Sequence, residues 1–113
     1  MRCVALFQHG PNWKRGRSVY EQGPPIEAHL ATMRQRYEEG SLLLGGPFER
    51  EGGIAVLEVA DESAAVDLLA VDPAVAAGVL AYTLHPLTAF FDAFASVSTD
   101  SSVAALARRR TQA

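Results

Sequence analysis

Three short runs of this chain are apolar at every position, and they restrict the folds open to it. The runs are Cys3–Phe7, Leu42–Leu44 and Ile54–Leu57. A strand in a sheet that has one face in water alternates apolar and polar side chains. Runs without that alternation therefore predict a sheet that is covered on both of its faces.

Glycines, prolines and apolar periodicity divide the chain into strands and helices. Strands are expected at Arg2–Gln8, Ser41–Glu49, Ile54–Val59 and Val79–Leu87, and helices at Ile26–Glu39, from the Asp61 cap through Val71, and as a short turn at Pro73–Gly78. The segment His9–Pro25 is a long loop, of a kind that is often functional or mobile. The order β-α-β-β-α-β predicts a ferredoxin-like α+β fold, with a four-stranded antiparallel sheet and two helices on one face.

Two helices cover only one face of such a sheet, so something else must cover the other. A second copy of the sheet is the simplest cover, because two-fold dimers are the commonest assembly. We therefore expect a homodimer, or a higher oligomer, with Phe90, Phe91 and Phe94 adding to the contact. The alternative is that the tail folds back over the sheet. Residues 1–94 are the expected domain, and residues 95–113 a partly helical or flexible tail.

The most specific chemistry comes from two polar residues set into apolar surroundings, His29 and Asp72. The apolar residues of the first helix recur at helical spacing at Ile26, Leu30, Met33 and Tyr37. At about 100° per residue, His29 falls roughly 70° from the centre of that stripe. It is therefore expected at the border of the buried face, where a side chain can be held and still reach solvent.

Each member of this pair also has a simpler interpretation. A lone histidine at a helix border usually satisfies a hydrogen bond, although an imidazole also suits general acid–base catalysis. Asp72 precedes Pro73, which is the pattern of a helix N-cap. As a partner, Asp72 would accept a hydrogen bond from one ring N–H of His29, fix the tautomer and raise the basicity of the other nitrogen. The residues alone favour the cap, and one carboxylate could serve both purposes.

A glycine-rich segment, Gly45-Gly46-Pro47-Phe48, is the third candidate element. The glycines allow close approach to the backbone, and Pro47 removes a ladder donor, so a bend or bulge is expected here. Backbone N–H groups beside the glycines could bind an anionic or enolate oxygen. A purely structural bulge is the simpler interpretation.

Three further residues complete the candidate pocket. His9 and Trp13 lie in the long loop and could close over a pocket or be ordinary loop residues. His85 lies on the last strand, where it points toward either the dimer layer or the pocket.

Several functions are not expected. A net charge of −3 without a basic stripe argues against nucleic-acid binding, and the cluster Arg108–Arg110 is interpreted as the solvated end of the tail. Cys3 is the single cysteine, and a cysteine in an apolar run packs as a small hydrophobe. The three histidines lack metal-binding spacing, and phosphate or dinucleotide motifs are absent. No signal peptide is visible, and no apolar run approaches the roughly 20 residues of a membrane span. We expect a cytoplasmic protein without metal or cofactor.

Several short motifs together resemble those of the YciI-like (YCII-related) family. In chain order they are His29-Leu30, Leu44-Gly-Gly-Pro-Phe48, Asp72-Pro73, Ala77-Gly-Val79 and His85-Pro86. The loop from Gly10-Pro-Asn-Trp13 through Gly16 resembles one branch of that family. The resemblance covers roughly residues 1–91, whereas the tail after Phe94 departs from the usual pattern.

The resemblance implies a dimeric ferredoxin-like fold, related to that of muconolactone isomerase, and a pocket built around a His–Asp pair. On the matching positions that pair is His29 and Asp72, and Gly46, Pro47 and Phe48 line the same site. One branch of the family resembles dehydrochlorinases that act on chlorinated hydroxyquinols, and the wider fold includes lactone isomerases.

We therefore expect a small, cofactor-free enzyme of lyase or isomerase type. His29, oriented by Asp72, would act as general acid–base on a small cyclic or aromatic carbonyl compound. The alternatives are a small-molecule-binding module, in which the pair binds an acid or phenol without turning it over, and a structural dimeric interaction module.

Overall fold

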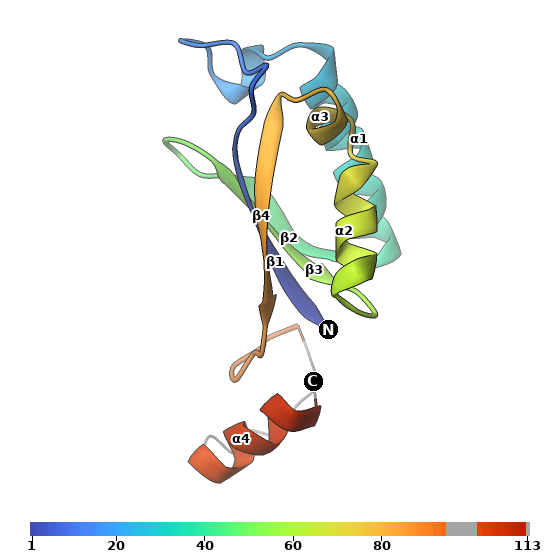
Figure 1. Ribbon diagram of the computed structural model, residues 1–113, viewed down its shortest axis with the longest axis vertical. Coiled ribbons are helices and arrows are strands. Elements are labelled where there is room, and N and C mark those ends of the chain that lie inside the picture. Colours follow the sequence, from blue (N-terminus) through green and yellow to red (C-terminus); the bar gives the residue numbers. More distant parts are fainter. Residues whose placement is uncertain (95–101, 113) are drawn as a thin grey trace.

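The computed structural model describes residues 1–94 and 102–112, and the rest of the expected tail lies outside the described residues (Figure 1). The elements are β1 (Arg2–His9), a 3-10 helix η1 (Val19–Glu21), α1 (Pro24–Glu39), β2 (Leu42–Pro47), β3 (Gly53–Glu58), α2 (Glu62–Ala70), α3 (Pro73–Ala76), β4 (Leu80–Leu87) and α4 (Val103–Gln112). The prediction of a ferredoxin-like α+β fold is confirmed, because the domain has the expected order β-α-β-β-α-β.

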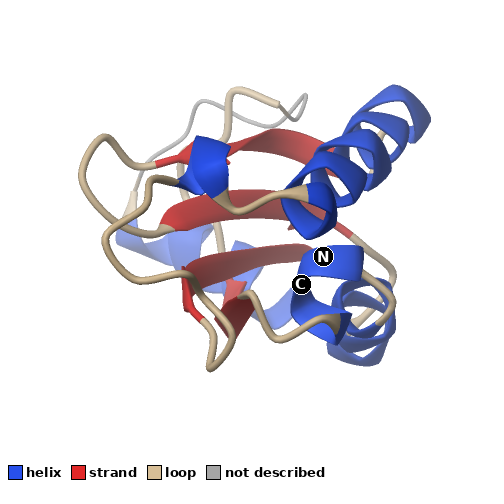
Figure 2. Cartoon of the chain, turned by 90° about the horizontal axis from the view of Figure 1, so that it is seen from above, coloured by secondary structure: helices blue, strands red, loops and turns tan. Residues whose placement is uncertain are grey.

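The four strands form one antiparallel sheet in the order β2-β3-β1-β4. Helices α1 and α2, with the short α3, lie on one face of it (Figures 1 and 2). The helix ends follow sequence signals: Gly40 ends α1 in the left-handed conformation, and the Asp61 carboxylate caps α2 by accepting the Ala64 N–H at 2.8 Å. The sheet therefore has a helix-covered face and an open face.

The hydrophobic core lies between the sheet and the helices. Cys3, Ala5 and Phe7 of β1 point into it and are buried, as are Ala55 and Leu57 of β3. These residues occupy alternate positions, as the pleat of a strand requires. The intervening residues are apolar as well, so they occupy the opposite face.

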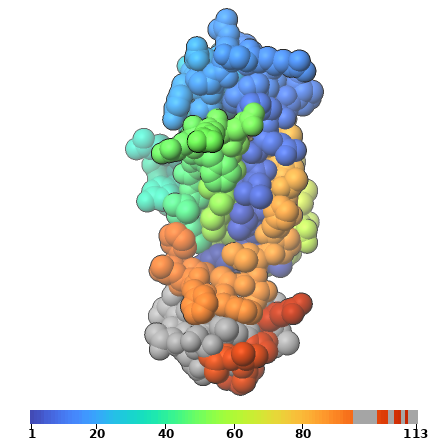
Figure 3. Space-filling view, turned by 90° about the vertical axis from the view of Figure 1, so that its left-hand side faces the viewer, coloured from blue at the N-terminus to red at the C-terminus, as the bar shows by residue number. Residues whose placement is uncertain are grey.

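That open face is not covered by any described helix. It carries Val4, Leu6, Ile54 and Val56, and Leu6 is 38% exposed. Figure 3 looks onto this side, where the strands lie uncovered. Helix α4 lies beyond the end of the sheet, so the alternative of a tail folded back over the face is not seen in the described residues.

Helix α1 is rotated relative to the expected stripe. Ile26 and Met33 are buried as predicted, but Leu30 is 56% exposed and Tyr37 is 63% exposed. His29 therefore lies on the inward face rather than at its border. The apolar periodicity gave the wrong centre for the buried face of α1, because it counted Leu30 and Tyr37 as core residues. Their side chains line a cavity instead.

The irregularity in β2 also lies elsewhere than predicted. The register shift occurs between Leu42 and Leu44, whereas Gly45, Gly46 and Pro47 pair in sequence with β3. Strand β2 is at the edge of the sheet, where proline costs no ladder bond if its nitrogen faces outward. The bend expected at the glycines is therefore replaced by a regular strand end.

Candidate active site

His29 of α1 and Asp72, the residue before α3, lie in contact. The Nδ1 atom of His29 is 2.8 Å from Oδ1 and 2.9 Å from Oδ2 of Asp72. Oδ2 also accepts the N–H groups of Ala74 at 3.1 Å and Val75 at 3.2 Å. The carboxylate of Asp72 therefore caps α3 and also hydrogen-bonds to the imidazole of His29.

The hydrogen bonds around Asp72 determine which ring nitrogen of His29 is free. Asp72 is fully buried, and a buried carboxylate needs such hydrogen bonds to offset the loss of water. An ionised carboxylate only accepts, so Nδ1 of His29 carries the shared hydrogen. In a neutral imidazole Nε2 is then an acceptor, and it has no hydrogen-bond partner among the described residues. The ring is further held edge-on against Phe7, with centroids 5.5 Å apart.

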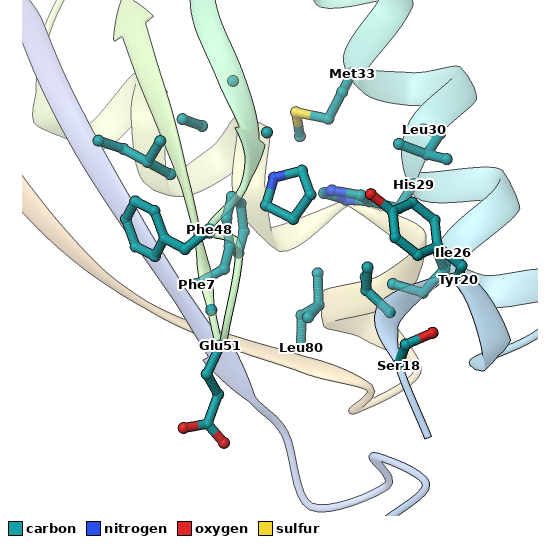
Figure 4. Close-up of a pocket in the computed structure, with 18 of the residues that line it drawn as sticks. Phe7, Ser18, Tyr20, Ile26, His29, Leu30, Met33, Phe48, Glu51 and Leu80 are labelled. Carbon is teal, nitrogen blue, oxygen red and sulfur yellow. The ribbon is translucent and has the colours of Figure 1, made fainter. Parts of the chain in front are cut away.

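A cavity of about 750 Å³ lies beside this imidazole. His29 reaches from α1 into the space between the helix and the strands (Figure 4). The apolar walls include Phe7, Ile26, Leu30, Met33, Phe48 and Leu80. Such a volume and lining suit one compact, largely apolar molecule.

The glycine-rich segment forms the strand wall of the cavity. Gly45, Gly46, Pro47 and Phe48 all line it. A Cβ added at Gly46 would meet no atom within 4 Å, so the wall is open there. Because β2 is an edge strand, alternate backbone N–H groups of this segment have no strand partner.

His9 and Trp13 also line the cavity. Their rings are stacked, with centroids 3.9 Å apart and planes 7° apart. The loop that carries Trp13 is tightly held rather than loose. Gly10 lies so close to Gly78 that a Cβ on Gly10 would be 2.2 Å from the Gly78 carbonyl oxygen. The loop therefore forms a fixed wall.

His85 does not belong to this site. It lies on the open face of the sheet beside Thr83, whose Oγ1 is 2.9 Å from its Nε2, and it does not line the cavity. Its position follows from alternation along β4, where Leu80 points to the helix-covered face. The prediction that His85 lines the pocket is wrong for that reason.

Sequence reasoning missed several residues of the site. Phe7, Tyr20, Met33 and Leu80 line the cavity, and Gln22 organises the loop. Phe7 could have been found from its alternation with Cys3 and Ala5. No local pattern distinguishes Gln22 from an exposed loop residue.

Residues 1–94 and 102–112 contain no group of three or more histidine, cysteine or acidic residues that could hold a metal ion. None of the helices in this part of the chain is both long and apolar enough to cross a bilayer.

A family model for the YCII-related domain matches residues 1–87. The chain belongs to the YCII-related domain family. A search of curated proteins found no match. Among solved structures, this YCII-related chain is similar to 5-chloro-2-hydroxyhydroquinone dehydrochlorinase of Burkholderia phenoliruptrix AC1100, in complex with 2,5-dihydroxybenzoquinone. The TM-score is 0.57 at 17% identity, over 75% of this chain and 92% of that chain, a likeness of fold.

Proposed function

We propose that this protein is a small, cofactor-independent enzyme in which His29 is the general acid–base and Asp72 orients it. The substrate is a compact cyclic or aromatic carbonyl compound, and the step is of lyase or isomerase type. One observation carries the proposal: the fully buried carboxylate of Asp72 lies 2.8 Å from Nδ1 of His29, whose other nitrogen has no partner among the described residues, beside a cavity. An imidazole arranged in this way can move a proton near neutral pH.

The proposed step begins with transfer of a carbon-bound proton, next to the carbonyl group, to Nε2 of His29. The electron pair moves onto the carbonyl oxygen, and the negative Asp72 stabilises the imidazolium that forms. Backbone N–H groups near Gly46 stabilise the developing oxyanion. His29 then returns the proton to another atom in an isomerisation, or the enolate expels a leaving group in an elimination.

The fold likeness supports the choice of substrate class. The similar structure is named as a dehydrochlorinase of a hydroxylated aromatic compound, and its ligand is a six-membered quinone ring. The cavity of this chain has apolar walls and ample room for a ring of that kind.

Exchange of carbon-bound hydrogen tests the proposal without knowledge of the natural substrate. Small cyclic ketones, lactones and hydroxyquinones are incubated with the protein in D2O, and loss of the proton next to the carbonyl is followed by NMR. The wild type should accelerate exchange for at least one compound, and His29→Gln should abolish the acceleration. His85→Gln is the matched control, because His85 does not line the cavity. Binding without accelerated exchange would instead support a non-catalytic binding module.

We further propose that the protein is a homodimer joined through the open face of the sheet. Support comes from the apolar side chains of Val4, Leu6, Ile54 and Val56 on that face, which no described helix covers. Burial of such a surface favours association. The contribution of Phe90, Phe91 and Phe94, assembly beyond a dimer and the cytoplasmic location remain predictions.

A further inference from the structure

A second histidine that lines the cavity, His9, is held in place by its neighbours. His9 is the last residue of β1 and points to the same side as Phe7, two positions earlier. Its Nδ1 lies 3.6 Å from Oε1 of Glu51, in the β2–β3 connection. Its ring lies flat against Trp13. Strand, aromatic ring and acid therefore together determine where the imidazole lies.

His9 and His29 are arranged alike with respect to their carboxylates. In each, Nδ1 faces the acid, and Nε2 has no hydrogen-bond partner among the described residues. The two acids differ, because Asp72 is fully buried whereas the side chain of Glu51 is 76% exposed. At 3.6 Å, Glu51 acts through its charge rather than a direct hydrogen bond, and exposed ion pairs stabilise a fold little. The contact of His9 with Glu51 therefore adds little to stability.

His9 and His29 both line the same cavity, with Phe7 beside each of them. The ring of His29 lies 5.5 Å from that of Phe7, and His9 follows Phe7 at the next same-side position, about 7 Å along the strand. Figure 4 shows Glu51, the acid beside His9, at the end of the cavity away from Met33. His9, whose Nδ1 is 3.6 Å from Oε1 of Glu51, therefore lies toward that end of the cavity.

The loop fixes the stack before any ligand binds. The N–H of Gly10 donates to the Val79 carbonyl at 2.9 Å, and the N–H of Asn12 donates to the Gly78 carbonyl at 2.8 Å. The Trp13 N–H donates back to the Gly10 carbonyl at 3.2 Å. Trp13 is thus held as a rigid platform for His9, and such preorganisation is what an electrostatic or proton-transfer group requires.

We propose that His9 is a second catalytic residue, which protonates the substrate's carbonyl oxygen while His29 removes the neighbouring carbon-bound proton. This inference rests on the proposed function. In the step, the C–H pair becomes the carbon–carbon double bond of an enol, and the carbonyl π pair binds the proton given by Nε2 of His9. The step starts with His9 as the imidazolium and His29 as the neutral imidazole, and it ends with His29 protonated and His9 neutral, so no proton is gained or lost. Ketonisation reverses both transfers, and His29 delivers its proton at another carbon.

Histidine NMR tests this directly, because the chain has only three histidines. The protein is labelled in its imidazole rings, the signals are assigned with single His→Gln variants, and 2,5-dihydroxybenzoquinone is added as the probe. We expect the His9 and His29 signals to shift together, with His85 as an unmoved internal control on the open face. A shift of His29 without His9 overturns this inference and leaves the proposed function standing. If neither signal moves, both proposals fail.

Substitution provides a second readout. His9→Gln should weaken binding of the same quinone by about tenfold to a hundredfold, because a charge-assisted hydrogen bond is lost. It should also slow hydrogen exchange next to the carbonyl by about a hundredfold, the usual contribution of a proton-transfer group. Urea unfolding of the variant should match the wild type. If His9→Gln binds the quinone as tightly as His85→Gln and exchanges hydrogen as fast, the catalytic role of His9 is overturned.

Discussion

The side chain of Gln22 binds the backbone of Lys14 at both of its polar groups. Its oxygen accepts the Lys14 N–H at 2.7 Å, and its nitrogen donates to the Lys14 carbonyl at 3.1 Å. The same nitrogen lies within hydrogen-bond distance of the carbonyls of Arg17 and Ser18, and Gln22 is 1% exposed. A single buried amide therefore organises the loop that carries Trp13.

Removal of this amide should loosen the loop. Gln22→Ala removes the partner of backbone groups in Lys14, Arg17 and Ser18 and empties a buried side-chain position, so we expect the free energy of unfolding to fall by about 1–3 kcal/mol. Urea denaturation followed by Trp13 fluorescence measures it. Gln35→Ala, at an exposed position of α1, is the matched control and should cost less than about 0.5 kcal/mol. Equal losses in the two variants would contradict the organising role of Gln22.

Asp72→Asn should separate the capping role from the proposed orienting role. Asparagine caps a helix about as well as aspartate, so we expect the free energy of unfolding to fall by only about 1–2 kcal/mol. The amide can instead donate to Nδ1 of His29, which reverses the tautomer and should lower hydrogen-exchange activity by about 10³–10⁴-fold. Exchange rates and urea unfolding measure the two effects.

The control for that substitution is Asp61→Asn. Asp61 caps α2 through the Ala64 N–H and is exposed. It shares the capping role of Asp72 without a histidine partner, so its substitution should leave exchange activity unchanged. If Asp72→Asn were as active as Asp61→Asn, His29 would not depend on the carboxylate.

Cys3 should be unreactive in the folded protein. Burial, and then the nearby charge of Glu62, raise the pKa of the Cys3 thiol above its ordinary value, so less of the reactive thiolate is present at pH 8. We expect Ellman's reagent to react more than about a hundredfold more slowly with native protein than with protein in concentrated urea, because reaction requires unfolding. Cys3→Ser, which has no thiol, gives the background absorbance of the reagent. Comparable rates in both states would show that the thiol is accessible.

The proposed dimer should depend on the open face of the sheet. Leu6→Arg places a charge in the centre of that face, where an unpaired buried charge opposes association. We expect light scattering to give a dimer mass for the wild type and a monomer mass for the variant. Val66→Arg, at an exposed position of α2, should remain a dimer. A monomeric wild type would refute the proposal.

Much of the fold was predictable because its signals are local. Glycine and proline mark the ends of α1 and of the loops, and Asp61 and Asp72 are caps that sequence shows directly. The apolar runs at Cys3–Phe7 and Ile54–Leu57 identified two strands and indicated that neither face is polar. Each of these signals concerns neighbours within one turn or one strand, where backbone geometry alone relates sequence to structure.

The errors concern the direction in which side chains point within the folded chain. His85 was counted with the candidate pocket although its direction was open, because alternation along β4 defines two faces but not which of them the helices cover. His29 was placed at a helix border because Leu30 and Tyr37 were counted as core, whereas they line a cavity. Apolar cavity walls and apolar cores have the same sequence pattern, so periodicity does not separate them.

The sequence by itself determined the order of strands and helices, the caps, and the apolar character of both faces of the central strands. Only the tertiary structure decided that His29 meets Asp72, 43 residues away, and that His9 stacks on Trp13 beside the same cavity. The physical reason is the separation along the chain over which each kind of interaction acts. Backbone preferences act between near neighbours, whereas these contacts depend on how α1, α3 and the long loop pack against one sheet.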